Sequence, residues 1–405
     1  MGAKKANGNG NGKVRVRMYR VGMGDCFLVT IPDGKKKRHI LVDCGVHAQS
    51  KFKGLAEAVA AMEKDTGGKL DVVIATHAHA DHISGFGTEA ETFKRMEIGE
   101  VWLPWLEDLS DPKAKVLHTK TAKLASLLDA HVQKLGANAD PIVQWAALNA
   151  VGAAKGRSQT GNNAKALDLL RSGFGDKSRT KYLRAGDVMK NAGGIKGLTV
   201  SVLAPADDPK FLSKMNPPEA QLYGLTDEGE LTDGKFSPFT LNWCVQDGEL
   251  GKDERALLVR QLAIPLQALA LSVDNYLNNT SLSLLLQFGG KTLLFPGDAQ
   301  WGNWLSWQDS WSSILGDISF YKVGHHGSHN ATPHEALKLM TKKGVAAMAS
   351  TDTVDSFNRG QFHVPYPKLV TAVKDQVADR YAQSDELKNA AAPFKVGDAC
   401  CDYFV

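Results

Sequence analysis

A cluster of metal-ligand side chains, placed directly after an apolar strand, limits the possible folds of this chain more than any other feature. Residues 70–75 (Leu-Asp-Val-Val-Ile-Ala) are typical of a short buried strand, and it is followed by His77, His79, Asp81 and His82. Imidazole and carboxylate groups suit zinc, manganese or iron. A surface loop that happens to hold three histidines is the alternative, but the density of ligands at a strand end favours a metal site.

Two further strands in the last third of the chain also end in ligand-type residues. Residues 291–295 lead into Asp298, and residues 318–323 lead into His325, His326 and Ser328. A carboxylate can bridge two cations about 3.5–4 Å apart, which is the role we expect for Asp298, although Gly-Asp after a strand is on its own more often a turn. His363 is isolated, so both a loop histidine and a catalytic histidine remain open.

The rest of the chain alternates predicted strands and helices. Strands are expected at 14–19, 26–31, 39–43, 100–104, 281–288 and 345–350, and as a pair at 182–187 and 198–205. Helices are expected at 52–65, 89–96, 301–315, 333–342 and 366–378. Apolar strands without a polar face indicate sheets covered by helices. Residues 1–13 are predicted to be a disordered tail, and insertions at about 105–180 and 207–272 to form a helical cap over the strand ends.

Composition excludes several classes of protein. The 405 residues are 43% hydrophobic and 23% charged, which is typical of a globular protein, and a net charge of +4 is no strong signature of nucleic-acid binding. The five cysteines have no C-x-x-C spacing, so neither a disulfide framework nor a thiolate zinc site is indicated. No stretch approaches the ~20 apolar residues of a membrane span, and we expect a cytoplasmic protein.

Taken together, these motifs resemble the metallo-β-lactamase superfamily. Within it they look most like the hydrolase domain of the bacterial competence DNA-uptake channel and its soluble relatives. The resemblance covers roughly residues 14–104, 182–206 and 275–370 and also includes the segments 21–28, 41–45 and 278–282. It leaves the two predicted insertions unmatched.

The resemblance implies an αββα sandwich, an α/β fold of two mixed sheets with helices outside, and a centre of two divalent ions, Zn or Mn. By the family pattern, one ion would be bound by His77 and His79 and the other by Asp81 and His82, with Asp298 bridging and His325 completing the second site. Asp43 would orient a ligand histidine. Many members have a further histidine between the first cluster and the bridging aspartate, but here that interval holds only His118 and His131, both in the predicted helical insertion.

Function is expected to follow from such a centre. We predict a two-metal-dependent hydrolase in which a hydroxide shared by the ions attacks the substrate. Asp81 would orient this hydroxide. His326 or His363 would contact the transferred group or protonate the leaving oxygen, and Ser328 would bind substrate. The expected substrate is a phosphodiester in nucleic acid (DNA or RNA) or a nucleotide.

Two alternatives remain open at this stage. A carbonyl hydrolase similar to β-lactamases, thioesterases or glyoxalases would use the same metal centre. A non-catalytic metal-binding interaction module would use the insertions to dock a partner. A regulatory protein partner or a homo-oligomer is compatible with either, and no membrane association is expected. The tryptophans at 301, 304, 307 and 311 are expected to form buried core rather than a docking surface.

Overall fold

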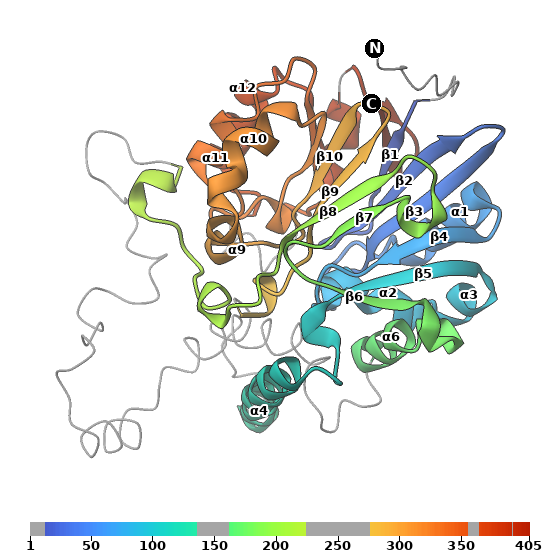
Figure 1. Ribbon diagram of the computed structural model, residues 1–405, viewed down its shortest axis with the longest axis vertical. Helices are drawn as coiled ribbons and strands as arrows, with labels where there is room; N and C mark the ends of the chain where they lie inside the picture. The colour runs from blue at the N-terminus through green and yellow to red at the C-terminus, as the bar shows by residue number, and fades with distance from the viewer. Residues whose placement is uncertain (1–12, 136–161, 224–275, 355–363, 391) are drawn as a thin grey trace, which may run out of the picture.

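The computed structural model describes residues 13–135, 162–223, 276–354, 364–390 and 392–405 (Figure 1). The predicted tail and the larger part of the 207–272 insertion therefore lie outside the described residues. Among the helices that are described, none combines the length and the apolar character needed to cross a bilayer.

The first sheet is built mainly from the N-terminal part of the chain. Its strands lie in the order β14 (Lys395–Val396), β15 (Cys400–Phe404), β1 (Arg15–Tyr19), β2 (Cys26–Asp33), β3 (Lys36–Cys44), β4 (Lys69–Ile74), β5 (Glu97–Pro104) and β6 (Thr180–Leu183). The strands from β3 to β6 are parallel, and the others pair antiparallel. The carboxyl ends of β3, β4 and β5 consequently meet at one edge of the sheet.

The second sheet is also mixed. Its order is β13 (Tyr381–Gln383), β12 (Ala346–Ala349), β11 (Phe320–Lys322), β10 (Lys291–Phe295), β9 (Ser283–Phe288), β8 (Thr199–Ala204) and β7 (Val188–Lys190). Strands β10 to β13 are parallel, while β7, β8 and β9 are antiparallel to their neighbours.

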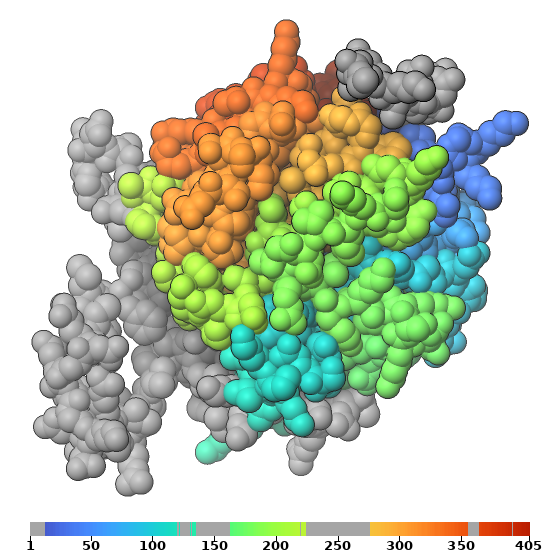
Figure 2. Space-filling view, viewed as in Figure 1, coloured from blue at the N-terminus to red at the C-terminus, as the bar shows by residue number. Residues whose placement is uncertain are grey.

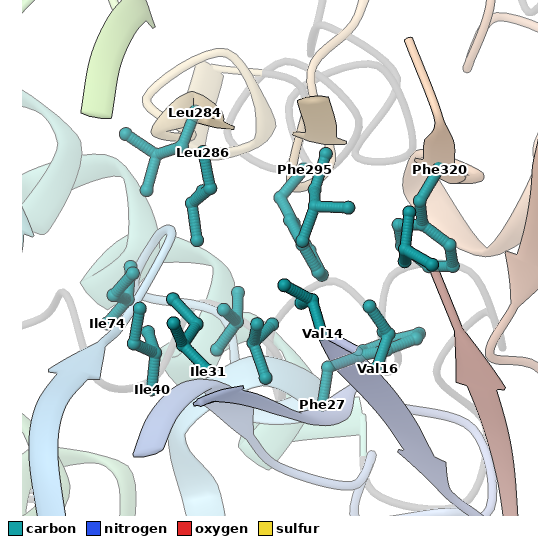
Figure 3. Packing of buried hydrophobic residues seen from close by; sticks show 14 of the residues in the cluster. Val14, Val16, Phe27, Ile31, Ile40, Ile74, Leu284, Leu286, Phe295 and Phe320 are labelled. Atoms are coloured by element: carbon teal, nitrogen blue, oxygen red, sulfur yellow. The ribbon is translucent and has the colours of Figure 1, made fainter. Parts of the chain in front are cut away.

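The core lies between the two sheets. Figure 3 shows Val14, Val16, Phe27, Ile31, Ile40 and Ile74 on one side, facing Leu284, Leu286, Phe295 and Phe320 on the other. Most of these side chains are 1% exposed or less. Because both sheets also carry apolar side chains on their outer faces, each needs a covering layer of helices.

Helices supply those outer layers (Figure 1). The first sheet is covered by α1 (Leu55–Thr66), α2 (Ala80–Thr88), α3 (Ala90–Arg95) and α6 (Asn162–Arg171). The second is covered by α9 (Trp301–Ser306), α10 (Trp311–Ile314), α11 (His334–Lys338) and α12 (Pro367–Gln376). The α1 helix ends at Gly67, which adopts the left-handed conformation of a C-terminal cap. The predicted αββα sandwich is confirmed.

The predicted pair of strands at 182–187 and 198–205 is wrong. Strand β6 joins the first sheet beside β5, whereas β8 lies in the second sheet between β7 and β9. The segment that connects β6 to β7 therefore crosses from the first sheet to the second. In Figure 2 the green part of the chain, which contains this segment, lies between the blue and the orange parts. Local alternation identifies both strands but contains no information about which sheet each one joins.

Two predicted helical regions differ from the structure. The predicted helix 301–315 is interrupted at Trp307, and 3-10 turns separate α9 from α10 and follow it. Its four tryptophans nevertheless form buried core, as expected. In the first insertion the structure describes α4 (Pro112–Leu135) and α6, with residues 136–161 outside the described part. The cap as a whole stays a prediction.

Candidate metal centre

The end of β4 delivers the first ligand-type residues. After β4 the chain bends at His77 and Ala78, His79 is extended, and α2 begins at Ala80, so that Asp81 and His82 lie in its first turn. This helix start packs tightly against the end of β3. A Cβ atom on Gly45 would lie 2.5 Å from the Asp81 carbonyl carbon, so only glycine fits there.

Four buried residues from both sheets converge at this point. Asp81 and His82 come from α2, Asp298 follows β10, and His326 follows β11; each is at most 2% exposed. The His82 Nε2 atom lies 3.0 Å from Asp298 Oδ2, and the His326 Nε2 atom lies 3.2 Å from Asp81 Oδ2 and 3.4 Å from Asp298 Oδ2. Ligand atoms of all four residues lie within 4.8 Å of one another, a spacing at which one cation can contact them.

His77 and His79 lie beside this group. The His77 Nε2 atom is 3.0 Å from His79 Nδ1, and the His77 and His82 rings are 4.2 Å apart between centroids. Both side chains are 1% exposed. The structure thus brings the whole His77–His82 cluster together with Asp298.

His325 and His326 lie differently with respect to the four-residue cluster. His326, expected to contact substrate, lies in the four-residue cluster; His325, expected to complete the second metal site, does not. Its Nε2 atom instead lies 3.5 Å from Asn278 Nδ2. Both histidines have a positive φ, +44° and +50°. This conformation is uncommon in consecutive non-glycine residues, and sequence periodicity does not reveal how it turns the two side chains.

Asp43 contacts His82 in the way its predicted role requires. One carboxylate oxygen lies 2.8 Å from His82 Nδ1 and accepts a hydrogen bond from the Thr76 hydroxyl, also at 2.8 Å. Its other oxygen accepts from the Thr76 backbone N–H at 2.7 Å. These contacts leave His82 Nε2 directed at Asp298.

Sequence reasoning missed two charged residues at the centre, Asp25 and Lys322. Both are almost fully buried, at 1% and 2% exposure, and form an ion pair with each other. The Lys322 Nζ atom also lies 3.2 Å from the Gly297 carbonyl oxygen and 3.5 Å from Asp298 Oδ1. The Gly-Met-Gly-Asp run at 22–25 was a signal for Asp25, because glycines permit a close backbone approach, but Lys322 stands out only once its burial is known.

The charges of these groups are strongly coupled. Burial opposes the charge on His326, but the Asp298 and Asp81 carboxylates outweigh it and raise the pKa of His326 to about 10. The pKa of His82 is likewise raised, because Asp298 and Asp43 outweigh its burial. Burial also opposes ionisation of Asp81 and Asp298, yet the neighbouring cationic histidines hold both pKa values below the usual range. Burial lowers the pKa of His79 to about 4.

These groups fit a divalent cation. Four buried carboxylates, on Asp25, Asp43, Asp81 and Asp298, face one lysine, and at neutral pH protonated His82 and His326 offset only part of the remaining negative charge. The Asp81 Oδ1 atom is buried and has no hydrogen-bond partner among the described residues. Unpaired oxygen and imidazole nitrogen atoms are the donors that zinc and manganese take.

The remaining candidates lie further out or are not described. Ser328 is mostly buried and its hydroxyl donates to Asn330 Oδ1 at 3.1 Å. His118, on α4, lies 3.0 Å from Arg171 Nη2 and is not part of the cluster. His363 and the side chain of His131 lie outside the described residues.

Comparison with known proteins agrees with this geometry. Residues 19–100 match the model of the metallo-beta-lactamase superfamily. No curated protein matches the chain significantly. Similar solved structures include Igni18, a metallo hydrolase from Ignicoccus hospitalis (12% identity, 96% of this chain and 99% of that chain, TM-score 0.41). Another is the metallo-beta-lactamase fold protein YhfI from Bacillus subtilis (11% identity, 91% and 95%, TM-score 0.34). Likenesses this distant carry no argument about function.

The family match covers β2 to β4, the first half of β5 and the His77–His82 cluster, while the two-sheet sandwich extends over the rest of the described chain. The fold is an α/β sandwich of two mixed sheets, consistent with that of the metallo-β-lactamase superfamily, whose model matches residues 19–100.

Proposed function

We propose that this chain is a two-metal hydrolase that cleaves phosphodiester bonds in nucleic acid or a nucleotide. The observation that carries the proposal is the buried cluster in which Asp298 Oδ2 lies within 3.4 Å of both His82 and His326. One oxygen placed between two imidazoles is suited to contact the cation that these two imidazoles would bind.

The residues divide into two groups around Asp298. His77 and His79 would hold one cation, and Asp81, His82 and His326 the other. Divalent ions at such positions lower the pKa of water and neutralise the charge that develops in the transition state. Asp43 holds the His82 ring in place from the side away from Asp298.

His325 would take the role that we expected for His326. Its Nδ1 atom is buried without a partner among the described residues, and its Nε2 atom faces the Asn278 amide, which can donate to it at 3.5 Å. With Nε2 accepting, the proton of the neutral ring lies on Nδ1. An Nδ1–H group beside the cluster is suited to hydrogen-bond a phosphoryl oxygen or the leaving oxygen.

Support for a phosphodiester substrate comes from the motifs. The segments 278–282 and 322–328 resemble the hydrolase domain of the competence DNA-uptake channel and its phosphodiesterase relatives more than carbonyl hydrolases. A fold of this kind hosts many chemistries, so substrate class has to be measured.

The test is hydrolysis by metal-analysed protein with added Mn²⁺ or Zn²⁺. Substrates are bis-p-nitrophenyl phosphate, single- and double-stranded DNA and RNA, a chromogenic β-lactam and a thioester. We expect phosphodiester cleavage that Asp81→Ala abolishes and that Asp309→Ala, an exposed control, leaves unchanged. Cleavage of the β-lactam or thioester alone would replace the phosphodiesterase with a carbonyl hydrolase. Metal binding without turnover of any substrate would favour the interaction module.

A further inference from the structure

A second group of possible metal ligands lies behind the first. The ligand atoms of Asp25, Asp43 and His82 are all buried and lie within 4.8 Å of one another. His82 belongs to both groups, and its Nδ1 atom is 3.7 Å from Asp25 Oδ2. By composition alone, this second group would be a candidate for a third cation.

The ammonium group of Lys322 already supplies a positive charge there. It forms its closest ion pair with the same oxygen of Asp25, and both side chains are at most 2% exposed. A buried carboxylate needs such a partner, because an isolated charge in the interior is strongly disfavoured. The protein thus provides its own permanent cation beside the proposed metal positions.

Lys322 also distinguishes the two oxygens of Asp298. Its Nζ atom lies 3.5 Å from Oδ1, and it donates to the carbonyl oxygen of the preceding residue, Gly297, at 3.2 Å. The other oxygen, Oδ2, is the one that faces His82 and His326. Attraction of Oδ1 toward Lys322 and anchoring of the Gly297 carbonyl together restrict rotation of this carboxylate.

We propose that the Asp25–Lys322 ion pair positions Asp298 so that a single oxygen, Oδ2, is presented to the metal ions. Lys322 is a positioning residue, since it acts through Asp298 and not on substrate. The proposal rests on the proposed function in that it requires the cluster to bind metal. It extends that function by naming the groups that set the geometry of the bridging ligand.

The experiment measures Mn²⁺ affinity by calorimetry for Lys322→Met, Asp25→Asn and the double variant, with thermal unfolding beside each. Lys322→Met should weaken Mn²⁺ binding roughly 10- to 100-fold, the usual effect of losing a group that orients a ligand. It should also lower the unfolding midpoint, because Asp25 is left buried without its partner. Lys291→Met, the same change at an exposed position on β10, should leave both quantities unchanged.

The double variant separates positioning from packing. Asp25→Asn removes the unpaired charge, so the unfolding midpoint should return toward that of the wild type. Mn²⁺ affinity should stay low, because nothing then holds Asp298 Oδ1. Recovery of affinity together with stability would show a purely structural pair and overturn the proposal.

Two other outcomes would overturn the proposed positioning role. Wild-type affinity in folded Lys322→Met would overturn the positioning role while leaving the proposed function intact. If Lys322→Met does not fold, the Mn²⁺ affinity of the double variant is compared with that of the wild type in its place. Absence of Mn²⁺ binding by the wild-type protein would overturn the proposed function and this inference with it.

Discussion

At the scale of single residues, protons and metal ions compete for the same atoms. Carboxylates raise the pKa of His82 and bring that of His326 to about 10, so both rings are protonated in the metal-free protein at neutral pH. Metal binding requires the neutral ring, and each proton must therefore leave. Raising the pH lowers the cost of that release.

We accordingly expect Zn²⁺ affinity to increase as the pH rises from about 6 to 8, by about tenfold per pH unit for each proton released. Calorimetric titration in buffers of different ionisation enthalpy measures both the affinity and the number of protons. The same affinity across this range, with no proton release, would show that these rings are not the ligands.

A second residue-scale prediction concerns Asp43. Asp43→Asn replaces the carboxylate that accepts from His82 Nδ1, and we expect a roughly 10-fold or greater loss of metal affinity. Asp71→Asn is the matched control, since Asp71 is also a buried carboxylate but pairs with Arg38 near the start of β4, away from the cluster that follows the end of this strand. Equal affinities in the two variants would remove the orienting role of Asp43.

The structure brings together several predicted residues whose chemistry is visible locally in the sequence. The ligand density of 77–82 and the strand before Asp298 were sufficient to bring these residues into one predicted site. The presence of His326 in the four-residue cluster could not be foreseen, because periodicity does not reveal the left-handed backbone conformations of His325 and His326. Lys322 was missed because a lysine in a strand is ordinarily solvated, and only the three-dimensional fold brings it to Asp25.

At the scale of elements, the position of α2 depends on Gly45, which has no side chain at the point where the first turn of the helix packs. Gly45→Ala would place a Cβ 2.5 Å from both the Asp81 carbonyl carbon and the His82 nitrogen. We expect a loss of about 1–3 kcal/mol in the free energy of unfolding from this overpacking. Metal affinity should fall as well, since the first turn of α2 must move.

Denaturant unfolding and metal titration of the same variant measure the two effects. Gly316→Ala serves as the control, because the nearest atom to its added Cβ is 4.0 Å away. A Gly45→Ala protein with wild-type stability and affinity would show that the α2 contact is looser than described.

Elements with a strong local pattern were predicted well, and those set by distant partners were not. Strands β4 and β10 were predicted to within a residue or so because their apolar runs are bounded by turns. The α2 helix was not predicted, since its Gly-containing sequence has weak helix propensity and packing against β3 stabilises it. Strand β15 was not predicted either, and its partner β1 lies almost the whole chain length away.

At the scale of the whole molecule, β15 links the end of the chain to both sheets. It pairs with β1 in the first sheet, and the Tyr403 ring stacks 6.1 Å from Phe320 in the second. Tyr403→Ala should therefore cost about 3 kcal/mol of unfolding free energy. Phe404→Ala, on the opposite face of the same strand and only partly buried, should cost clearly less; similar losses would contradict this description of the core.

The most direct test of the central claim is anomalous diffraction from crystals grown with Mn²⁺ or Zn²⁺. The account predicts a strong peak enclosed by Asp81, His82, Asp298 and His326, and a second beside His77 and His79. A peak at the first position alone would retain the metal centre but reduce it to one ion. Crystals that contain bound metal elsewhere, with no peak among these residues, would contradict the claim that this cluster is the metal centre.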